Sequence, residues 1–291
     1  MIERLRPYFI LLAVLAAIGQ AACNPASIQP TASPALSTTV PAPRLPSTAA
    51  PSPVPEGQCA NPLVPLLPGY KWTYASTGTA RPSRVEISVI SVGSSKANLQ
   101  IMDVDQETAT QAAAGCVQGA IIDFPPIFFR MLLADIMNAF VSTETLYGVY
   151  VPSKDTLVKN GWVYLWNRVE LAQEGVRITL PGSGGEIFTS VNREVLFVTK
   201  IGSAPERVTI PAGTYPQAVR VSQVVKLPVT QLTASGSEDG ELMVEFSQWY
   251  EPYVGLLKMQ VENAGLSFDP GASTPVAVKA AIALIRFQTG R

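Results

Sequence analysis

The side chains that could carry catalytic or metal chemistry are few in this 291-residue chain. It has three cysteines, Cys23, Cys59 and Cys116, and no histidine. Histidine is the commonest general base near neutral pH and a frequent metal ligand. Its absence excludes Ser-His-Asp and Cys-His hydrolases and zinc enzymes with His ligands. Because the cysteines are also far apart in the sequence, we predict no metal site and no cofactor.

Carboxylates are the remaining candidates for catalysis. Glycoside hydrolysis needs only two Asp or Glu side chains at a set separation, and the candidates here are Asp103, Asp105, Glu107 and Glu170. Asp103 and Asp105 would share one face of a strand, because successive side chains alternate between faces. An acidic, solvent-facing strand end is the commoner reason for that spacing. We therefore predict a protein that is not an enzyme, with a carboxylate-based glycoside hydrolase as a lower-ranked alternative.

Cys59 and Cys116 fall in the body of the chain. In an oxidising compartment an isolated pair of cysteines most simply forms a disulfide. Closing a loop of this length would stabilise the fold by about 4 kcal/mol in the chain-entropy model. A two-cysteine metal site is the rival interpretation, which the missing histidine disfavours. We predict a Cys59–Cys116 disulfide that fastens the start of the domain to its third or fourth strand.

The amino terminus has the pattern of a secretory signal. Arg4 and Arg6 precede an uncharged run over residues 8–22, whose apolar part is shorter than the roughly 20 residues that a membrane helix needs. We predict a signal peptide over residues 1–22 and a location outside the cytoplasm for the rest of the chain.

Ala21, Ala22 and Cys23 resemble the cleavage box of bacterial lipoproteins, in which the cysteine sulfur receives a diacylglycerol. Gln20 stands where those boxes usually carry Leu or another aliphatic residue. The resemblance implies a lipid on Cys23 and the membrane as a partner. Simple secretion and an uncleaved anchor stay as alternatives.

Residues 23–56 form a segment rich in Pro, Ser, Thr and Ala, with Arg44 as the only charge before Glu56. Such a composition cannot bury enough apolar surface to offset the entropy of ordering. We predict a disordered tether that carries an extracytoplasmic domain, residues 57–291.

Nucleic acid is excluded as a partner of this domain. The formal net charge of the whole chain is −1, and the basic residues do not gather in one stretch. Binding to nucleic acid needs a clustered basic face.

Apolar and polar residues alternate through most of the domain. In SRVEISVISV, residues 83–92, the side chains of Val85, Ile87 and Val89 fall on one face and polar side chains on the other. Similar segments recur to the end of the chain, separated by Gly, Pro and Asn. The pattern predicts a mainly β domain with antiparallel, curved or partly open, barrel-like sheets.

A faint repeat raises an alternative organisation of the domain. Residues 65–74 and 158–166 both run from a Gly turn into an aromatic strand. A duplication of this kind would give two related halves, with a sub-division near residue 150.

Residues 127–141, IFFRMLLADIMNAFV, break the alternation. They follow Pro125 and Pro126, which suit a helix start, and more than half of the helix circumference would be apolar. Such a helix must be buried, and we expect it against the concave face of the sheet. It would be a core helix, a lid over an apolar cavity, or a surface that rests on a membrane. The residues expected to line such a cavity are Phe128, Met131, Leu132, Ile136 and Phe140.

An aromatic group lies near the end of the chain, in WYEPYVGLLK, residues 249–258. The Pro and Gly of this segment predict a bend between two strands. Trp249, Tyr250 and Tyr253 most simply pack in the core. If they formed an exposed row, they could stack on sugars.

Five short motifs resemble those of a family of bacterial exported proteins of unknown function. They follow Cys59 and are PLxPGxxWxY (residues 65–74), CxxG (116–119), a restart similar to P…GxxW (152–162), PAGTY (211–215) and WYxPxVGLxK (249–258). The resemblance implies an antiparallel, partly open β architecture and no known reaction.

Together these observations predict a membrane-anchored extracytoplasmic protein that acts by binding. An apolar or lipid-like ligand suits a curved sheet with one apolar helix. A cell-surface structural or interaction module that contacts glycan or a partner protein is the alternative.

Overall fold

The computed structural model describes residues 57–134, 140–155, 166–171, 176–178, 187–189, 193–201 and 204–290, apart from residues 79, 148, 234–235, 269–270, 272 and 277. The signal peptide, Cys23 and the tether lie outside the described residues. All described residues belong to one compact unit within Pro46–Arg291.

The described part of the domain is built almost entirely from strands, in chain order. The first strands are β1 (Lys71–Gly78), β2 (Arg84–Val92), β3 (Lys96–Asp103), β4 (Thr108–Val117), β5 (Ala120–Asp123), β6 (Phe140–Tyr147), β7 (Trp166–Leu171), β8 (Val176–Ile178) and β9 (Ile187–Thr189). The later strands are β10 (Arg193–Ile201), β11 (Glu206–Ile210), β12 (Gly213–Thr233), β13 (Gly236–Glu251), β14 (Gly255–Ser267), β15 (Thr274–Pro275) and β16 (Ala280–Gln288).

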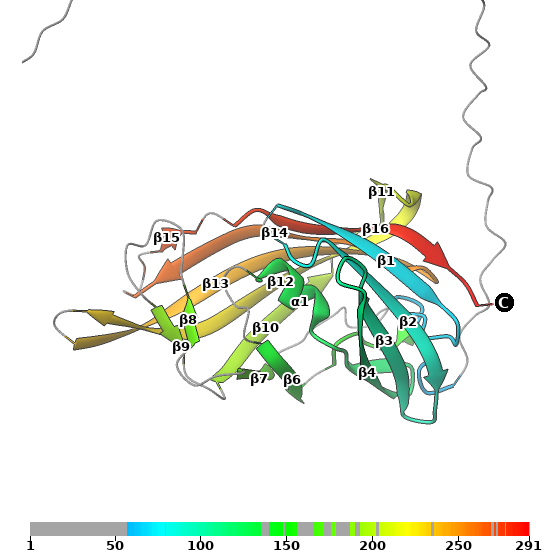
Figure 1. Cartoon of the computed structure of the whole chain (residues 1–291), viewed down its shortest axis with the longest axis horizontal. Coiled ribbons are helices and arrows are strands. Elements are labelled where there is room, and N and C mark those ends of the chain that lie inside the picture. Colours follow the sequence, from blue (N-terminus) through cyan, green and yellow to red (C-terminus); the bar gives the residue numbers. More distant parts are fainter. Residues whose placement is uncertain are drawn as a thin grey trace, which may run out of the picture. The chain divides into compact units, whose positions relative to one another are not determined.

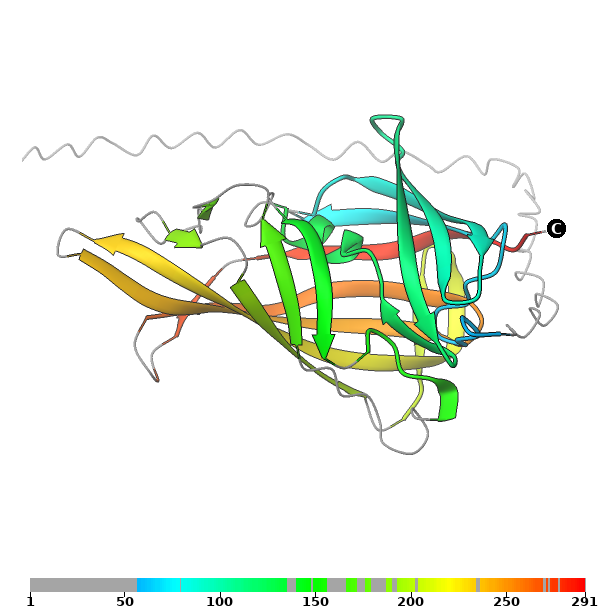
Figure 2. The ribbon, with the colours of Figure 1, turned by 90° about the horizontal axis from the view of Figure 1, so that it is seen from below.

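The main sheet is antiparallel and follows the order β5-β4-β3-β2-β1-β16-β14-β13-β12-β10-β7-β6. It curls into an incomplete barrel, and Figures 1 and 2 show its concave side around α1. The β3–β4 hairpin extends beyond the body of the sheet (Figure 2). This architecture confirms the prediction of a mainly β domain with a curved, partly open antiparallel sheet. The sheet runs continuously on both sides of residue 150. Within the proposed repeat, residues 158–165 lie outside the described residues.

The predicted alternation places the core on the concave face. Val85, Ile87 and Val89 of β2 are buried, and Leu99 and Ile101 of β3 face the same side. Burial of these side chains supplies most of the favourable free energy for a sheet with one solvated face.

Helix α1 (Ile127–Leu132) is shorter than the predicted helix over residues 127–141. Its start is as predicted, directly after Pro126. Leu133 leaves the helical region, with φ −105° and ψ 15°, and the chain has become strand β6 by Phe140. In β6 the β-branched residues Val141, Thr143 and Thr145 favour a strand. Pairing with β7 stabilises this strand over the helix that the apolar pattern of residues 127–141 predicts.

Helix α1 packs into the hollow of the sheet, as expected. The ring of Phe128 lies 5.0 Å from that of Tyr74 on β1, and the ring of Phe129 lies 5.4 Å from that of Phe246 on β13. Both contacts are edge-to-face, the arrangement that aromatic quadrupoles favour. The helix therefore joins strands that are distant in the sequence.

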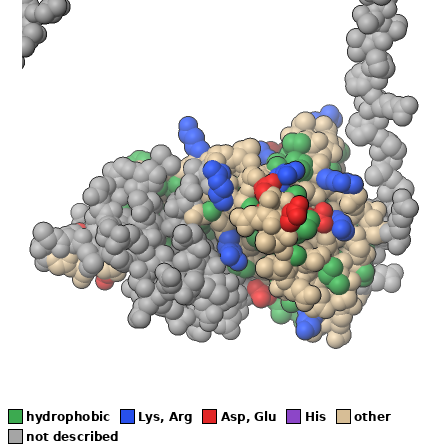
Figure 3. Space-filling model, viewed as in Figure 1, with side chains coloured by type: hydrophobic (Ala, Val, Ile, Leu, Met, Phe, Trp, Pro, Cys, Tyr) green, Lys and Arg blue, Asp and Glu red, His purple; other side chains and the backbone are tan. Residues whose placement is uncertain are grey.

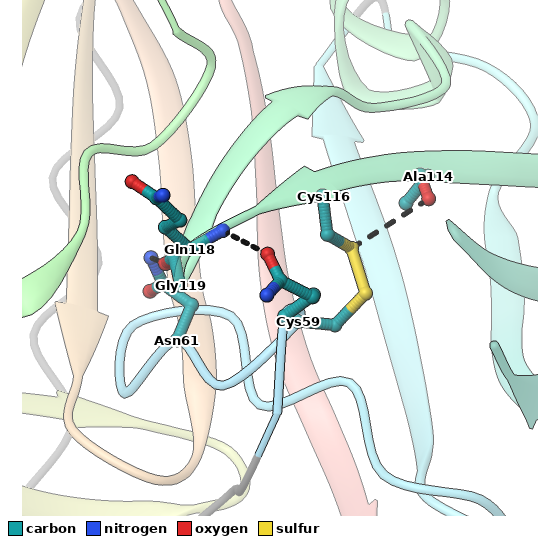
Figure 4. The surroundings of a disulfide bond; sticks show 7 residues. Cys59, Asn61, Ala114, Cys116, Gln118 and Gly119 are labelled. Carbon is teal, nitrogen blue, oxygen red and sulfur yellow. Dashed lines mark hydrogen bonds between the residues drawn. A yellow bond between two sulfur atoms is a disulfide. The ribbon is translucent and has the colours of Figure 1, made fainter. Parts of the chain in front are cut away.

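The amino-terminal end of the domain is fastened by the predicted disulfide. Cys59 and Cys116 are bonded, with an S–S distance of 2.13 Å, and both are buried. Cys116 belongs to β4, the fourth strand. Figure 4 shows Asn61 near Gly119, with its side chain directed at the turn after β4.

Asn61 is fully buried, and both the nitrogen and the oxygen of its side-chain amide make hydrogen bonds. Its Nδ2 donates to the carbonyl oxygens of Gly119 (2.8 Å) and Pro152 (2.9 Å), and its Oδ1 accepts from the backbone N–H groups of Leu63 and Val64. A buried carbonyl or N–H without a partner is costly. Asn61 therefore connects three separate segments at the point where the chain enters the sheet.

Candidate ligand groove

A groove opens beside α1 on the concave side of the sheet. Its volume is about 660 Å³, and it lies between α1, strands β2–β4 and the β3–β4 turn. Pockets for small ligands commonly enclose roughly 300–1,000 Å³. The groove is therefore large enough for a small molecule or a flexible chain.

The floor of the groove is apolar. Val85 and Ile101 reach it from β2 and β3, because inward and outward side chains alternate along a strand. Ile127 and Met131 border it from α1, where residues four apart lie on the same side of a helix. Ile127 is partly exposed, whereas Met131 is fully buried. The sequence assigned Met131 to a cavity but gave no sign that Ile127, Val85 and Ile101 would join it.

The rim of the groove carries charged groups of both signs. Arg130 of α1, Arg81 of the β1–β2 loop, and Asp103 and Asp105 at the β3–β4 turn all line it. Arg81 Nη1 donates to the carbonyl oxygen of Ala80 at 2.8 Å. Arg130 is exposed, and its guanidinium group makes no hydrogen bond or ion pair with the residues that the structure describes. Figure 3 shows basic and acidic side chains mixed with hydrophobic ones on the surface seen in that view.

A second hollow of about 320 Å³ continues the groove along β4. It lies between Gln111, Ala112 and Ala113 of β4 and the segment from Asp123 to Ile127. Ile101, Thr110, Ile127 and Arg130 line both hollows. The unpaired Arg130 therefore stands where the two hollows meet.

The candidate catalytic carboxylates make structural contacts at the β3–β4 turn. Asp103 Oδ1 accepts from the backbone N–H groups of Asp105 and Gln106, at 3.0 and 3.1 Å. Asp105 accepts from the Ser83 hydroxyl and from the Arg84 backbone, and forms an ion pair with the Arg84 guanidinium at 2.9 Å.

The Ser83 hydrogen bond, followed by those from Arg84, lowers the pKa of Asp105 from its ordinary value. A lowered pKa suits a carboxylate that stays ionised in a fixed ion pair. Glu107 belongs to the same turn, with a positive φ of 54°. The side chain of Glu170, on β7, lies outside the described residues.

The residues predicted to line one cavity are placed differently by the structure. Met131 lines the groove, whereas Phe128 lines a small internal void of about 30 Å³ with Tyr74 and Phe124. That void has room for about one water molecule. Leu132 is buried in the core. Ile136 and the side chain of Phe140 lie outside the described residues.

Trp249 and Tyr250 do not form an exposed row. As neighbours on β13 they face opposite sides of the sheet, and they are 5% and 1% exposed. The Trp249 ring lies under Lys258, whose Nζ is 4.0 Å from the ring centroid, and its Nε1 donates to Glu206. Tyr250 donates to Gln248 Oε1 at 2.7 Å. Tyr253 is partly exposed in the bend between β13 and β14, with φ 65°.

Neither a metal cluster nor a membrane-spanning helix is found in the described part of the chain. No three His, Cys, Asp or Glu side chains in it are grouped to hold a metal ion. In the same residues no helix has the length and apolarity to cross a bilayer.

No protein-family model and no curated protein matches the sequence. Among solved structures, the chain is similar to that of a Bacteroides fragilis protein, which is named as an exported protein with a YmcC-like fold. The sequence identity is 16% and the TM-score is 0.41. It is also similar to a Parabacteroides distasonis protein named as a lipoprotein, with 13% identity and a TM-score of 0.43. Each match covers 78% of this chain and 99% of the other. These names apply to those two proteins.

Proposed function

We propose that the chain is an extracytoplasmic, membrane-anchored binding protein, without enzymatic activity, whose groove holds an amphiphilic ligand. The observation that supports the proposal is the unpaired Arg130 at the rim of a groove with an apolar floor. Apolar pockets with a few placed polar groups are the usual form of small-molecule sites. The ligand would therefore have an apolar chain and an acidic group.

The apolar chain would lie on Ile127 and Ile101, with the buried Val85 and Met131 bordering the groove, and its acidic group would pair with Arg130. A charge-assisted hydrogen bond to a carboxylate or phosphate is about twice as strong as a neutral one. An acidic amphiphile would therefore gain binding free energy both from apolar contact with the floor and from the ion pair at the rim.

Export is supported by residues outside the groove. The buried Cys59–Cys116 disulfide is of the kind that persists in oxidising compartments. The apolar leader and the cysteine that ends it support a lipid anchor on Cys23. Replacing Cys23 with Ser should release the protein into the medium, while continued membrane association of that variant would point to an uncleaved helix.

The groove is tested with cis-parinaric acid, a fluorescent fatty acid, titrated into the full chain kept soluble in amphipol. Arg130→Gln should weaken binding about tenfold, the value of one hydrogen bond to a charged group. Thr110→Trp should abolish saturable binding, because Thr110 lines the junction of the two hollows.

Two matched variants control this experiment. Arg207→Gln removes an exposed arginine from β11, and Gln100→Trp adds an indole to the outer face of β3. Both should bind as the unmodified chain does. Equal affinities for Arg130→Gln and Arg207→Gln, or saturable binding by Thr110→Trp, would reject the groove as the site.

A further inference from the structure

Strand β4 is paired along most of its length on one side but only over its last residues on the other. Strand β3 pairs with it from Thr108 to Gly115, whereas β5 pairs only with Gly115, Cys116 and Val117. Beyond Asp123 the chain continues into Pro125 and Pro126, which have no N–H group and cannot extend the ladder. Residues 108–113 of β4 therefore form a sheet edge in the described structure.

The backbone groups that face this edge can be identified from the register. The N–H of Cys116 donates to the carbonyl oxygen of Ser95 at 2.8 Å, on the β3 side. In an antiparallel pair such groups alternate along the strand, so the N–H and C=O of Ala109, Gln111 and Ala113 point away from β3. Within the described residues none of these groups has a backbone partner.

The edge lacks the features that usually protect one. Natural edges carry lysine or other charges, proline or bulges that discourage further pairing. Residues 108–114 read TATQAAA, with no charge and no proline, and 108–111 are exposed. The pairing with β3 is regular over the same residues.

The edge and the groove adjoin each other. Gln111, Ala112 and Ala113 line the second hollow, and Thr110 and Arg130 lie at its junction with the larger one. An extended peptide bound in the second hollow would continue the line of β5 and lie beside the outward-facing N–H and C=O groups of β4. Addition of an extended peptide to an exposed edge is a common mode of peptide recognition.

We infer that the ligand of the groove is an acylated peptide with an acidic residue. Its acyl chain lies in the larger hollow, and its extended backbone bonds to Ala109, Gln111 and Ala113 as an added strand. The acidic residue pairs with Arg130 at the junction. This inference rests on the proposed function, because it assigns the acyl chain to the same groove.

Charge favours a peptide over a second copy of the chain at this edge. Two copies joined through β4 in an antiparallel manner would have their concave faces on the same side. The two Arg130 side chains would then stand on one face of the joined sheet, and like charges facing each other destabilise a pairing. An acidic peptide instead compensates the single Arg130.

The experiment compares probes and variants in the full chain. The probes are cis-parinaric acid, myristate, and the acylated peptide myristoyl-Glu-Val-Thr-Val-Thr-Ser, whose Glu follows the acyl group directly, the last two measured by displacement of the first. We expect the acylated peptide to bind at least about tenfold more tightly than myristate, because it adds backbone hydrogen bonds.

Position 111 separates backbone from side-chain effects. Gln111→Pro removes the outward N–H, and proline is tolerated on an edge where that group faces solvent, whereas Gln111→Ala keeps the N–H. Gln111→Pro should weaken binding of the acylated peptide about tenfold relative to Gln111→Ala.

Three results would overturn the inference. These are equal binding of myristate and the acylated peptide, equal effects of the two substitutions, and a concentration-dependent dimer in sedimentation that Gln111→Pro abolishes. If cis-parinaric acid binds while the acylated peptide shows no advantage, the inference fails and the proposed function stands. If cis-parinaric acid does not bind, the proposed function itself fails.

Discussion

The two halves of strand β4 differ in how their backbone is held. At the carboxyl-terminal half, Cys116 is bonded to Cys59, β5 completes the pairing, and Asn61 binds the turn that follows. At the amino-terminal half, residues 108–113 pair only with β3 among the described strands and border the groove. One strand therefore carries both the disulfide and an edge that is unpaired among the described residues.

This difference shows how a fold can present an unpaired edge. An edge strand that binds a partner must stay extended while its outward N–H and C=O groups remain accessible. In this domain, the disulfide and Asn61 fix one half of β4, and the ladder with β3 carries that order to the other half. Four predictions test this division, from the largest expected effect to the smallest.

Removing the disulfide should have the largest effect. A Cys59→Ser and Cys116→Ser double variant loses the constraint on a loop with a sequence separation of 57. We expect it to lower the free energy of unfolding by about 4 kcal/mol. Urea denaturation measures the change, and the unmodified chain under reducing conditions should match the variant. A loss below about 1 kcal/mol would show that the constraint does not hold this half of β4.

Asn61→Ala should have the next largest effect. It leaves the buried carbonyl oxygens of Gly119 and Pro152 and two backbone N–H groups without their partner. We expect a loss of about 3 kcal/mol in the free energy of unfolding. Asn98→Ala, which removes an exposed hydrogen bond to Ser91, is the control and should cost about 0.5 kcal/mol or less. Equal losses for the two variants would contradict the role given to Asn61.

Proline scanning should separate the two sides of β4. The N–H of Ala112 points into the ladder with β3, while that of Gln111 points to the edge. Ala112→Pro should therefore cost about 2 kcal/mol more than Gln111→Pro in the free energy of unfolding. Urea denaturation of both variants provides the measurement. The reverse order would mean that the edge is assigned to the wrong side.

Acid should have the smallest effect, confined to the β3–β4 turn. Because the pKa of Asp105 is lower in the folded chain, its contribution to stability is complete above the unfolded value of about 3.9. That contribution is lost as the pH falls through the folded pKa.

The stability difference between the unmodified chain and Asp105→Asn should thus be constant above about pH 5 and shrink below about pH 4. Urea denaturation across this pH range measures the difference, and NMR titration of the carboxyl group gives the pKa. Ser83→Ala should move the pKa of Asp105 back toward its ordinary value. A titration midpoint above 3.9 would contradict the assigned contacts.

Local patterns in the sequence were sufficient for much of the fold. The alternation around Val85 and Ile87 predicted a half-buried strand, and the cysteine pair predicted the disulfide. The start of α1 after Pro126 was also predicted, but its end was wrong, because the pairing of β6 with β7 overrides the apolar period of residues 127–141.

The groove could be predicted only in part. Met131 was expected in a cavity, but Phe128 and Leu132 pack in the core, and Ile101 and Arg130 were not singled out. The spacing of Asp103 and Asp105 indicated a shared strand face, whereas in the structure both carboxylates hold the β3–β4 turn. Contacts such as that between Asp105 and Ser83 join residues 22 positions apart, which no local period reveals.

The sequence by itself determined the strand character of the domain, the pairing of its two cysteines and the start of its helix. These properties follow from side-chain alternation, residue type and proline, which act over a few residues. Only the tertiary structure decided that β1 pairs with β16 across the length of the domain. It also decided that, among the described residues, β5 stops short of covering β4 and Arg130 stands unpaired at the rim of the groove. The physical reason is that strand order and edge exposure arise from the competition among all strands for hydrogen-bonding partners and for burial.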